Sequence, residues 1–323
     1  MKAMIYDHYG DPDVLHPAEI DRPVPKAHEV LIKVHATSVT AADYRARALD
    51  VPPGFGLPAR LTFGLRKPRN PVLGVELAGE VVEVGSKVSR FRIGDQVFGT
   101  NLHMGGYAEY AVRDERSALA RMPDNMSYEE SAAIAFGAQT ALYYLRDIGH
   151  IQTGDKVLVY GASGGVGTAA VQLARYFGAE VTGVTSTANL ELVRSLGADR
   201  VIDYTERDYT ATGEQYDLII DTVGKTSFEH ARSALKPDGK YLAVAGGMHE
   251  YLLQAWTAIK RGQRVRCSVA RERVEDLEFI RDLVEAGRYQ PAIDRSYPFE
   301  QLPEAHAYAS RGHKRGNVVV SLE

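Results

Sequence analysis

Cysteine is almost absent from this chain. Its 323 residues include a single cysteine, Cys267, which excludes an internal disulfide framework and a structural zinc cluster built from several thiolates. The ten histidines contain no HxxxH or HExxH pair, so they suggest no zinc motif on a helix either. These residues therefore point to no metal site.

Long apolar runs and an excess of charge of one sign are also lacking. No run is long enough to span a bilayer, and residues 1–6 resemble a charged strand rather than a signal peptide. We therefore expect a cytoplasmic protein with no membrane partner. The formal net charge is −4 with the signs interspersed, so no nucleic-acid partner is expected. We interpret the basic residues Arg60, Arg66, Lys67 and Arg69 as solvated loop charges.

The glycine-rich run at residues 161–167 is the most informative feature that is present. A short apolar run precedes it at residues 157–159, and apolar residues at helical spacing follow it. A strand that turns this sharply into a helix directs free N–H groups and the positive end of the helix dipole at one point, which suits a pyrophosphate. The spacing matches the dinucleotide fingerprint, with Ala162 at its first glycine position, followed by Gly164 and Gly167.

A strand–helix turn that binds nothing is the alternative interpretation, and the neighbouring elements favour nucleotide binding over it. The chain is β-rich up to about residue 125, apart from a long loop at residues 49–71 that contains many Pro and Gly. After residue 127, helices and strands alternate, which predicts a doubly wound parallel α/β sheet of the Rossmann type. The cofactor-binding residues predicted in the glycine run are Ser163, Gly164, Gly165, Val166 and Gly167.

Five segments, the glycine run among them, resemble one known family. They lie at residues 74–85, 92–97, 105–111, 137–141 and 161–167, and they are similar to the medium-chain dehydrogenase/reductases, specifically the zinc-independent quinone oxidoreductase branch. Residues 186–199 and the loop before Pro71 resemble the chloroplast-envelope homologues. The resemblance implies a GroES-like catalytic domain at residues 1–125 and an NADP-binding Rossmann domain at 126–263. It also implies a C-terminal segment, 264–323, that returns to the catalytic domain, and a homodimer.

Two positions separate this chain from the zinc-dependent alcohol dehydrogenases that it also resembles. Those enzymes have a histidine ligand at the position of Val75 and a cysteine near the position of Ser38. Neither valine nor serine is a suitable ligand for tetrahedral zinc. We therefore expect a metal-free protein in which Glu76 is hydrogen-bonded within the fold.

The second strand of the Rossmann unit ends without the carboxylate that usually accepts the ribose 2′-hydroxyl of NAD. Residues 184–189 read VTSTAN, and hydroxyls with nearby cations can hold a 2′-phosphate instead. By resemblance, Ser186 and Tyr204 contact that phosphate. Arg207 or Arg194 is a candidate for the charge, although each also fits a solvated surface. NADPH is therefore the predicted cofactor.

The resemblance assigns six more positions to the cofactor. Thr140 matches a threonine close to the nicotinamide, with a hydroxyl bonded inside its own helix as the alternative. Gly246 and Gly247 end a sheet strand where backbone contact with the cofactor is expected. Residues 315–317 resemble a segment that reaches back to the cofactor, although lysine is common where this chain has asparagine. These last three predicted contacts are Arg315, Gly316 and Asn317.

A nicotinamide without a metal favours hydride transfer to a small-molecule electrophile, a quinone or a related carbonyl, because conjugation itself spreads the developing charge. Tyr44 resembles the family's pocket-lining segment and is the candidate proton donor, with a core packing role as the alternative. Asp43 and Arg47, four residues apart, predict a structural ion pair. The alternatives are an NADPH-dependent enone reductase and a non-catalytic NADPH-binding redox sensor.

Overall fold

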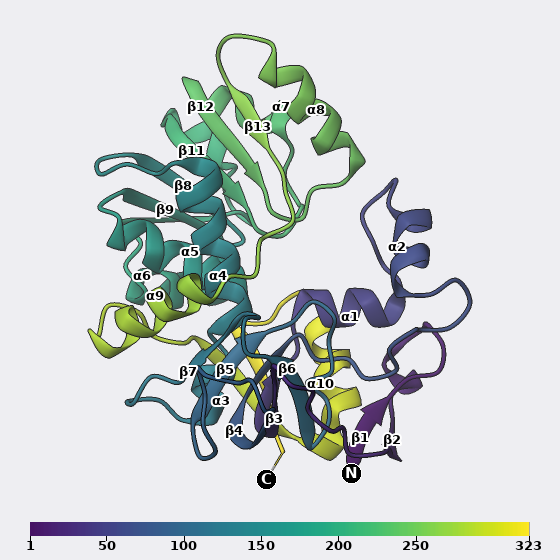
Figure 1. The fold of residues 1–323 in the computed structure, drawn as a ribbon. Helices are drawn as coiled ribbons and strands as arrows, with labels where there is room; N and C mark the ends of the chain where they lie inside the picture. The colour runs from purple at the N-terminus through teal and green to yellow at the C-terminus, as the bar shows by residue number, and fades with distance from the viewer. Residues whose placement is uncertain (323) are drawn as a thin grey trace. The chain divides into compact units, whose positions relative to one another are not determined.

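The computed structural model describes residues 1–322, which divide into two units, each built on its own sheet (Figure 1). The first unit contains Met1–Val51, Gly56–Gln139 and the C-terminal part from Glu272 onward. The second contains Thr140–Arg271 together with the short segment Pro52–Phe55. The boundaries predicted from the sequence lie after residues 125 and 263. No helix among the described residues is long and apolar enough to cross a bilayer.

The first unit is built on a seven-stranded sheet that combines strands from both ends of the chain. The strand order is β14 (Ile293–Pro298), β15 (Asn317–Ser321), β3 (Glu29–Ser38), β4 (Glu76–Val84), β5 (Gln96–Thr100) and β7 (Leu119–Arg121), and β6 (Tyr110–Asp114) also pairs with β3. A separate ribbon is formed by β1 (Lys2–Ile5) and β2 (His16–Glu19). Strand β15 runs antiparallel to β3, with Val319 opposite Ser38. The C-terminal segment is thus part of the first unit's sheet.

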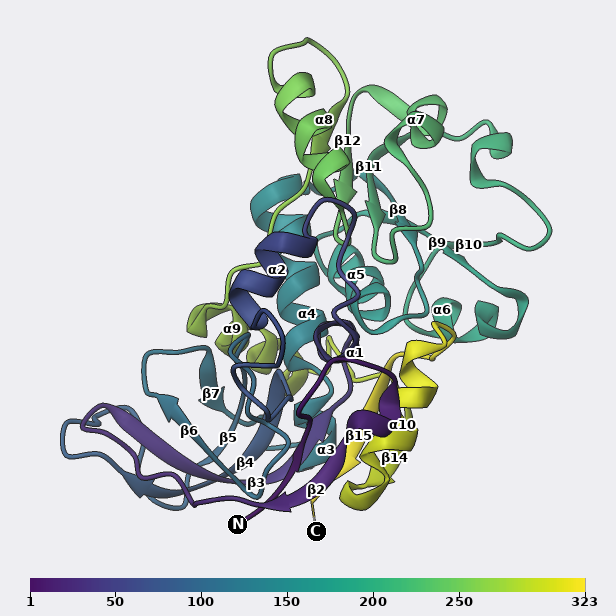
Figure 2. The same cartoon turned by 90° about the vertical axis from the view of Figure 1, so that its right-hand side faces the viewer.

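The helices of the first unit are short, and one of them lies where the sequence predicts a loop. They are α1 (Ala41–Ala48), α2 (Gly56–Phe63), α3 (Tyr128–Ala132), α9 (Val274–Glu285) and α10 (Leu302–Ser310), and α4 (Ala135–Leu142) spans the boundary between the units. The prediction of a long loop at residues 49–71 is therefore wrong over α2 (Figure 2). The capping box predicted at Ser127 is present, because its side chain accepts from the Glu130 N–H and Glu130 bonds back to the Ser127 N–H.

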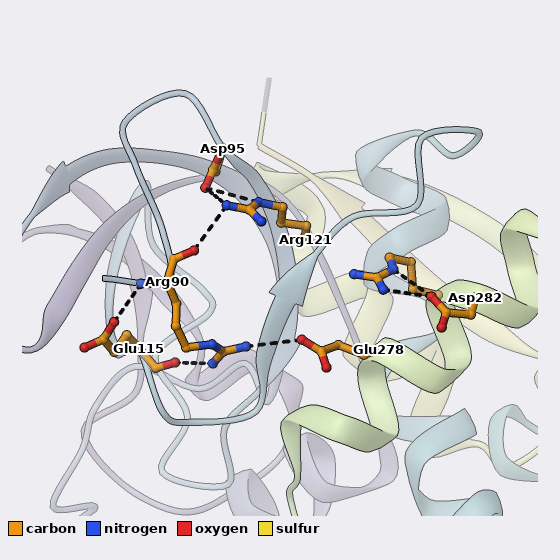
Figure 3. A network of polar contacts seen from close by, with 7 residues as sticks. Arg90, Asp95, Glu115, Arg121, Glu278 and Asp282 are labelled. Atoms are coloured by element: carbon orange, nitrogen blue, oxygen red, sulfur yellow. Dashed lines mark hydrogen bonds and ion pairs between the residues drawn. The ribbon is translucent and has the colours of Figure 1, made fainter. Parts of the chain in front are cut away.

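A polar network ties α9 to the loops of the sheet (Figure 3). Arg121 Nη2 lies 2.9 Å from Asp95 Oδ2, and Arg90 Nη2 lies 3.4 Å from Glu278 Oε1 on α9. The buried carboxylate of Glu115 accepts the backbone N–H groups of residues 89 and 90 at 2.8 and 3.0 Å. These backbone bonds lower the pKa of Glu115 to about 2. The network joins α9, from the C-terminal part of the chain, to the loops between N-terminal strands of the same unit.

The second unit is a parallel sheet of six strands. The order is β10 (Arg200–Asp203), β9 (Glu180–Thr185), β8 (Lys156–Tyr160), β11 (Tyr216–Asp221), β12 (Leu235–Ala243) and β13 (Arg264–Arg266), and every pairing is parallel. Its helices are α5 (Gly165–Tyr176), α6 (Leu190–Ser195), α7 (Phe228–Ala231) and α8 (Met248–Ala258), with a π-helical turn at Tyr143–Gly149. Numbered within the unit, the order is 3-2-1-4-5-6, which is the order of dinucleotide-binding sheets. The order reverses between β8 and β11, so a ligand site is expected beyond their carboxyl ends.

Candidate functional site

The turn after β8 is formed by a glycine with a left-handed backbone. Gly161 has a φ of +79°, and a Cβ there would lie 2.7 Å from the side chain of Val223. The N–H groups of Gly161 and Ala162 donate to the carbonyl of Val184 at 3.1 and 3.0 Å, which ties the turn to β9. The left-handed position is thus one residue before Ala162, and Ala162 itself is fully buried.

Helix α5 begins directly inside the glycine run. Gly164 is its N-cap, and no side chain caps its first turn. The N–H groups of a helix's first turn have no partner within the helix, so those of Gly165, Val166 and Gly167 can bind an anion. A Cβ on Gly167 would lie 2.1 Å from the Gly161 carbonyl oxygen, whereas a Cβ on Gly164 would meet nothing closer than 3.6 Å. Gly167 is therefore required by packing, and space is open next to Gly164.

The end of β9 carries a cluster of hydroxyls joined by one amide. The Ser163 hydroxyl accepts from Thr185 Oγ1 at 2.8 Å and from Asn189 Nδ2 at 3.2 Å. Asn189 Nδ2 also donates to Ser186 Oγ at 3.3 Å. The structure thus brings together Ser163 and Ser186, two of the predicted residues. Asn189 was not among the predicted site residues. The available signal was its place three residues after Ser186, in a stretch that lacks an acid.

The two arginines considered for the phosphate charge differ in their partners. Arg194 forms an exposed ion pair with Glu191, so its guanidinium already has a carboxylate partner. Arg207 is exposed and donates from Nη2 to the Ala211 carbonyl at 2.8 Å, with no ion pair to a described carboxylate. Tyr204 is 47% exposed, and its N–H donates to the Thr185 carbonyl at 3.0 Å, which places it beside the hydroxyl cluster.

Three further predicted residues belong to the second unit. Thr140 lies in α4 and is buried. A Cβ on Gly246 would lie 2.6 Å from the Cys267 sulfur, so the backbone packs tightly there. The N–H of Gly247 donates to Glu250 Oε2 at 2.7 Å at the start of α8. The Gly247 amide therefore has an internal partner, and the three cofactor contacts stay predictions.

The buried carboxylate of Glu76, together with Ser38 and Val75, forms a corner of the first unit. Glu76 is 1% exposed at the start of β4. Its Oε2 accepts from the Ser38 hydroxyl, and its Oε1 accepts from the Phe136 N–H. Burial raises the pKa of Glu76 to about 7, against the lowering effect of these two bonds. The expectation that Glu76 is hydrogen-bonded within the fold is confirmed.

The donor set at this corner does not fit zinc. Val75 presents a fully buried apolar side chain, and the Ser38 hydroxyl and both oxygens of Glu76 are used in hydrogen bonds within the unit. Across residues 1–322, no group of three or more His, Cys, Asp or Glu side chains is placed to hold a metal ion.

The predicted ion pair between Asp43 and Arg47 is wrong. Asp43 Oδ1 accepts the N–H groups of Gly74 and Val75 at 3.1 and 3.0 Å, and Oδ2 accepts from the backbone and hydroxyl of Thr40 at 2.8 and 2.6 Å. Arg47 is 3% exposed, and its Nε and Nη1 have no hydrogen-bond partner among the described residues. The carboxylate caps α1 and a neighbouring turn, and these four donors replace the arginine.

The remaining predicted residues lie in the first unit. Tyr44 is partly buried against a hydrophobic cluster, and burial raises its pKa. No hydrogen bond joins its hydroxyl to another residue in the described part of the chain. The Arg315 N–H donates to Asp294 Oδ2 at 2.8 Å. Gly316 has a φ of +72°, and Asn317 Nδ2 donates to the Ala292 carbonyl at 3.3 Å. The side chain of Asn317 thus has a structural partner.

Two family models match the chain, one in each half. The alcohol dehydrogenase GroES-like domain matches residues 26–124, and the zinc-binding dehydrogenase model matches residues 196–320. Together with the observed parallel sheet, they confirm the predicted fold class, a GroES-like domain combined with a Rossmann domain.

Similar proteins cover the whole chain. The chloroplast envelope quinone oxidoreductase homolog of Arabidopsis thaliana is 34% identical over 99% of this chain and 98% of its own. The 2-methylene-furan-3-one reductase of Solanum lycopersicum is 32% identical over 99% of this chain and 79% of its own. Among solved structures, the quinone oxidoreductase from Coxiella burnetii superposes with a TM-score of 0.88 at 29% identity, covering 100% of this chain and 99% of that one. The protein is thus an oxidoreductase that belongs to the medium-chain dehydrogenase/reductase superfamily, in its quinone oxidoreductase branch.

Proposed function

We propose that this protein transfers a hydride from NADPH to a quinone or a related conjugated carbonyl, without a metal. The observation that carries the proposal is the pairing of an uncapped α5 N-terminus with a hydroxyl cluster at the end of β9. The N–H groups of Gly165, Val166 and Gly167 would hold the pyrophosphate. Bound NADPH would supply the hydride, and the protein would supply binding and orientation.

The preference for NADPH over NADH rests on charge at the end of β9. The hydroxyls there are those of Ser163, Thr185 and Ser186, with Asn189 joining the two serines. Charge-assisted hydrogen bonds from Arg207 would add the positive charge that a 2′-phosphate requires. Arg194 is the weaker candidate because it pairs with Glu191. The carboxylate of Asp203, at the end of β10, accepts hydrogen bonds from the backbone N–H and the hydroxyl of Thr205.

The acceptor follows from the chemistry that the first unit offers. Ser38, Val75 and Glu76 form no metal-ligand set, so nothing there would help an ordinary alcohol to lose its proton. A quinone or an enone spreads the developing charge over its own conjugated system and needs no such help. Tyr44, whose hydroxyl has no hydrogen-bond partner among the described residues, is our candidate proton donor to the reduced acceptor.

Reduction of an enone double bond is a second candidate, favoured by the similarity to the tomato 2-methylene-furan-3-one reductase. NADPH oxidation should be measured with a quinone, with an enone and with no acceptor. Faster turnover of the quinone supports the proposal, and faster turnover of the enone supports the second candidate. Tight NADPH binding without turnover of any electrophile would instead indicate a redox sensor.

The cofactor preference has its own test at Ser186. In Ser186→Asp, a carboxylate would repel the 2′-phosphate and accept the ribose hydroxyl of NADH. We expect the KM for NADPH to rise at least tenfold and the KM for NADH to fall. Ser195→Asp, at the end of α6, introduces the same charge and serves as the matched control. Equal effects of both variants on the two cofactors would contradict the assignment of Ser186.

A homodimer remains a prediction from the family resemblance, and a cytoplasmic location remains a prediction from the sequence. Light scattering of the purified protein at several concentrations tests the first prediction, because a dimer has twice the chain mass of 35.5 kDa. Fractionation of the native cells tests the second.

A further inference from the structure

The segment around α2 carries a positive charge that no nearby acid neutralises. Residues 51–75 contain no Asp or Glu, whereas they contain four cations. All four are exposed, and none forms an ion pair with a carboxylate in the described part of the chain. The cations are Arg60, Arg66, Lys67 and Arg69. The local charge of about +4 contrasts with the formal net charge of −4 for the whole chain.

Helix α2 and the turn after it carry apolar side chains that pack inward and others that are exposed. Ala59 is buried, and Phe63, four residues later, packs against a hydrophobic cluster of the first unit. Leu57, Leu61 and Leu65 are 67%, 53% and 58% exposed. Exposed apolar side chains that lie together and are rimmed by polar ones mark an interaction site. The exposed leucines therefore indicate such a site.

The leucines and the cations are held together by defined hydrogen bonds. Arg60 Nη1 donates to the Leu65 carbonyl at 2.8 Å, and the Arg69 N–H donates to the Phe63 carbonyl at 2.7 Å. The Tyr9 hydroxyl donates to the Gly64 carbonyl at 2.9 Å, which anchors the end of α2 to the N-terminal part of the unit. We name the exposed residues Leu57, Leu61, Leu65, Arg60, Arg66, Lys67 and Arg69 the α2 patch.

We propose that the α2 patch docks on the anionic surface of a lipid bilayer. The three leucines insert at the boundary between headgroups and acyl chains, and the four cations contact anionic headgroups. Because the rest of the chain is net acidic, this patch sets the orientation of the protein on the surface. The contact is peripheral, since no described helix can span a bilayer.

Charge decides against the other occupants of the patch. A second copy docking patch to patch across a two-fold axis would place like charges opposite one another. Nucleic acid would match the cations, but the apolar side chains that it stacks on are aromatic rather than leucine. The sequence alone predicts solvated loop charges and no membrane partner, because it does not show that Leu57, Leu61 and Leu65 are exposed.

Sedimentation of the full chain with vesicles tests the proposal. We expect binding to vesicles of phosphatidylcholine that contain phosphatidylserine, weaker binding at high salt, and little binding to pure phosphatidylcholine. Arg66→Gln combined with Lys67→Gln should weaken binding roughly 30-fold, because each cation near an anionic surface contributes about a fivefold effect. Leu61→Ser should weaken it about tenfold or more.

Matched controls separate the patch from general effects of charge and apolarity. Lys87→Gln removes one exposed cation outside the patch, and Val24→Ser removes an apolar side chain that is 81% exposed. Both should leave vesicle binding unchanged. Circular dichroism and the unfolding midpoint confirm that every variant is folded. Turnover with a water-soluble acceptor should be equal in the patch variants and in the original chain.

Four outcomes would overturn the proposal. The first is equal binding to vesicles with and without phosphatidylserine, or no binding to either. The second is equal weakening by the controls and by the patch variants. The third is loss of turnover in Leu61→Ser without vesicles, which would assign the leucines to the acceptor. The fourth is a concentration-dependent rise in mass that Leu61→Ser abolishes, which would assign the patch to a second copy.

Discussion

The buried corner around Glu76 and the N-terminus of α5 use their polar groups in opposite ways. At the corner, both oxygens of Glu76 accept hydrogen bonds from the same unit. At α5, no side chain caps the helix, and open space adjoins Gly164. Buried polar groups are almost always paired, so polar groups left unpaired beside open space mark the place for a ligand. The comparison separates a structural carboxylate from a binding site, although sequence motifs point to both.

Substitution of two glycines should give the largest contrast. Gly167→Ala would place a Cβ 2.1 Å from a backbone oxygen, so we expect a loss of about 1–3 kcal/mol or more of stability, together with loss of NADPH binding. Gly164→Ala meets nothing closer than 3.6 Å, so its stability should change by less than about 0.5 kcal/mol. Its NADPH affinity should fall roughly tenfold, because the methyl group projects where the pyrophosphate would bind.

Urea unfolding and fluorescence titration with NADPH measure the two effects separately. If Gly164→Ala binds NADPH as tightly as the original chain does, the α5 terminus is not the pyrophosphate site. Unpaired N–H groups beside open space would then not mark a ligand site in this protein.

Glu76 should make the free energy of unfolding depend on pH. Burial raises the pKa of Glu76 from 4.5 to about 7, so the folded chain holds a proton that the unfolded chain has released between these values. The contribution of protonated Glu76 to the free energy of unfolding is therefore complete below pH 4.5, and it is lost as the pH rises through 7. Relative to Glu76→Gln, the original chain should lose on the order of 3 kcal/mol across this range.

Unfolding in urea at several pH values tests this prediction. Glu80→Gln, on the same strand and partly exposed, controls for the removal of one carboxylate. A Glu76→Gln variant whose stability follows the same pH profile as that of the original chain would show that Glu76 is ionised when folded.

Substitutions at Asp43 and Arg47 should change the stability by an intermediate amount. Asp43→Asn should cost about 1–3 kcal/mol, because the charged acceptor for four donors is lost. Arg47→Met should be neutral or stabilising, because a buried cation with unpartnered nitrogens is replaced by an apolar side chain. The double variant should show a coupling energy below about 0.5 kcal/mol. A coupling energy several times that size would show that Asp43 and Arg47 do form an ion pair.

The amide that joins the hydroxyl cluster should give the smallest effect. Asn189→Ala removes the bonds to Ser163 and Ser186 and should cost about 1 kcal/mol of stability. The KM for NADPH should rise more than the KM for NADH, because the two serines are no longer held together. Equal changes in both KM values would mean that the cluster supports the turn without selecting the phosphate.

Local patterns in the sequence predicted most of the second unit. The strand before the glycine run, the helix after it and the alternation that follows are short-range features, and the structure has them as β8, α5 and a parallel sheet. The capping box at Ser127 is equally local. The partner of Asp43 could not be predicted in this way, because its donors include Gly74 and Val75, about thirty residues further along the chain.

The sequence by itself determined the chemistry that is available to this protein. One cysteine, no zinc-ligand pattern and a glycine turn between a strand and a helix are properties of residue type and spacing. Only the tertiary structure decided which polar groups are paired within the fold and which apolar groups stay exposed. The pairing of Glu76 with Ser38, the joining of β15 to β3 and the exposure of Leu57, Leu61 and Leu65 all depend on contacts between distant segments. Such contacts are set by packing, which no local pattern of residues encodes.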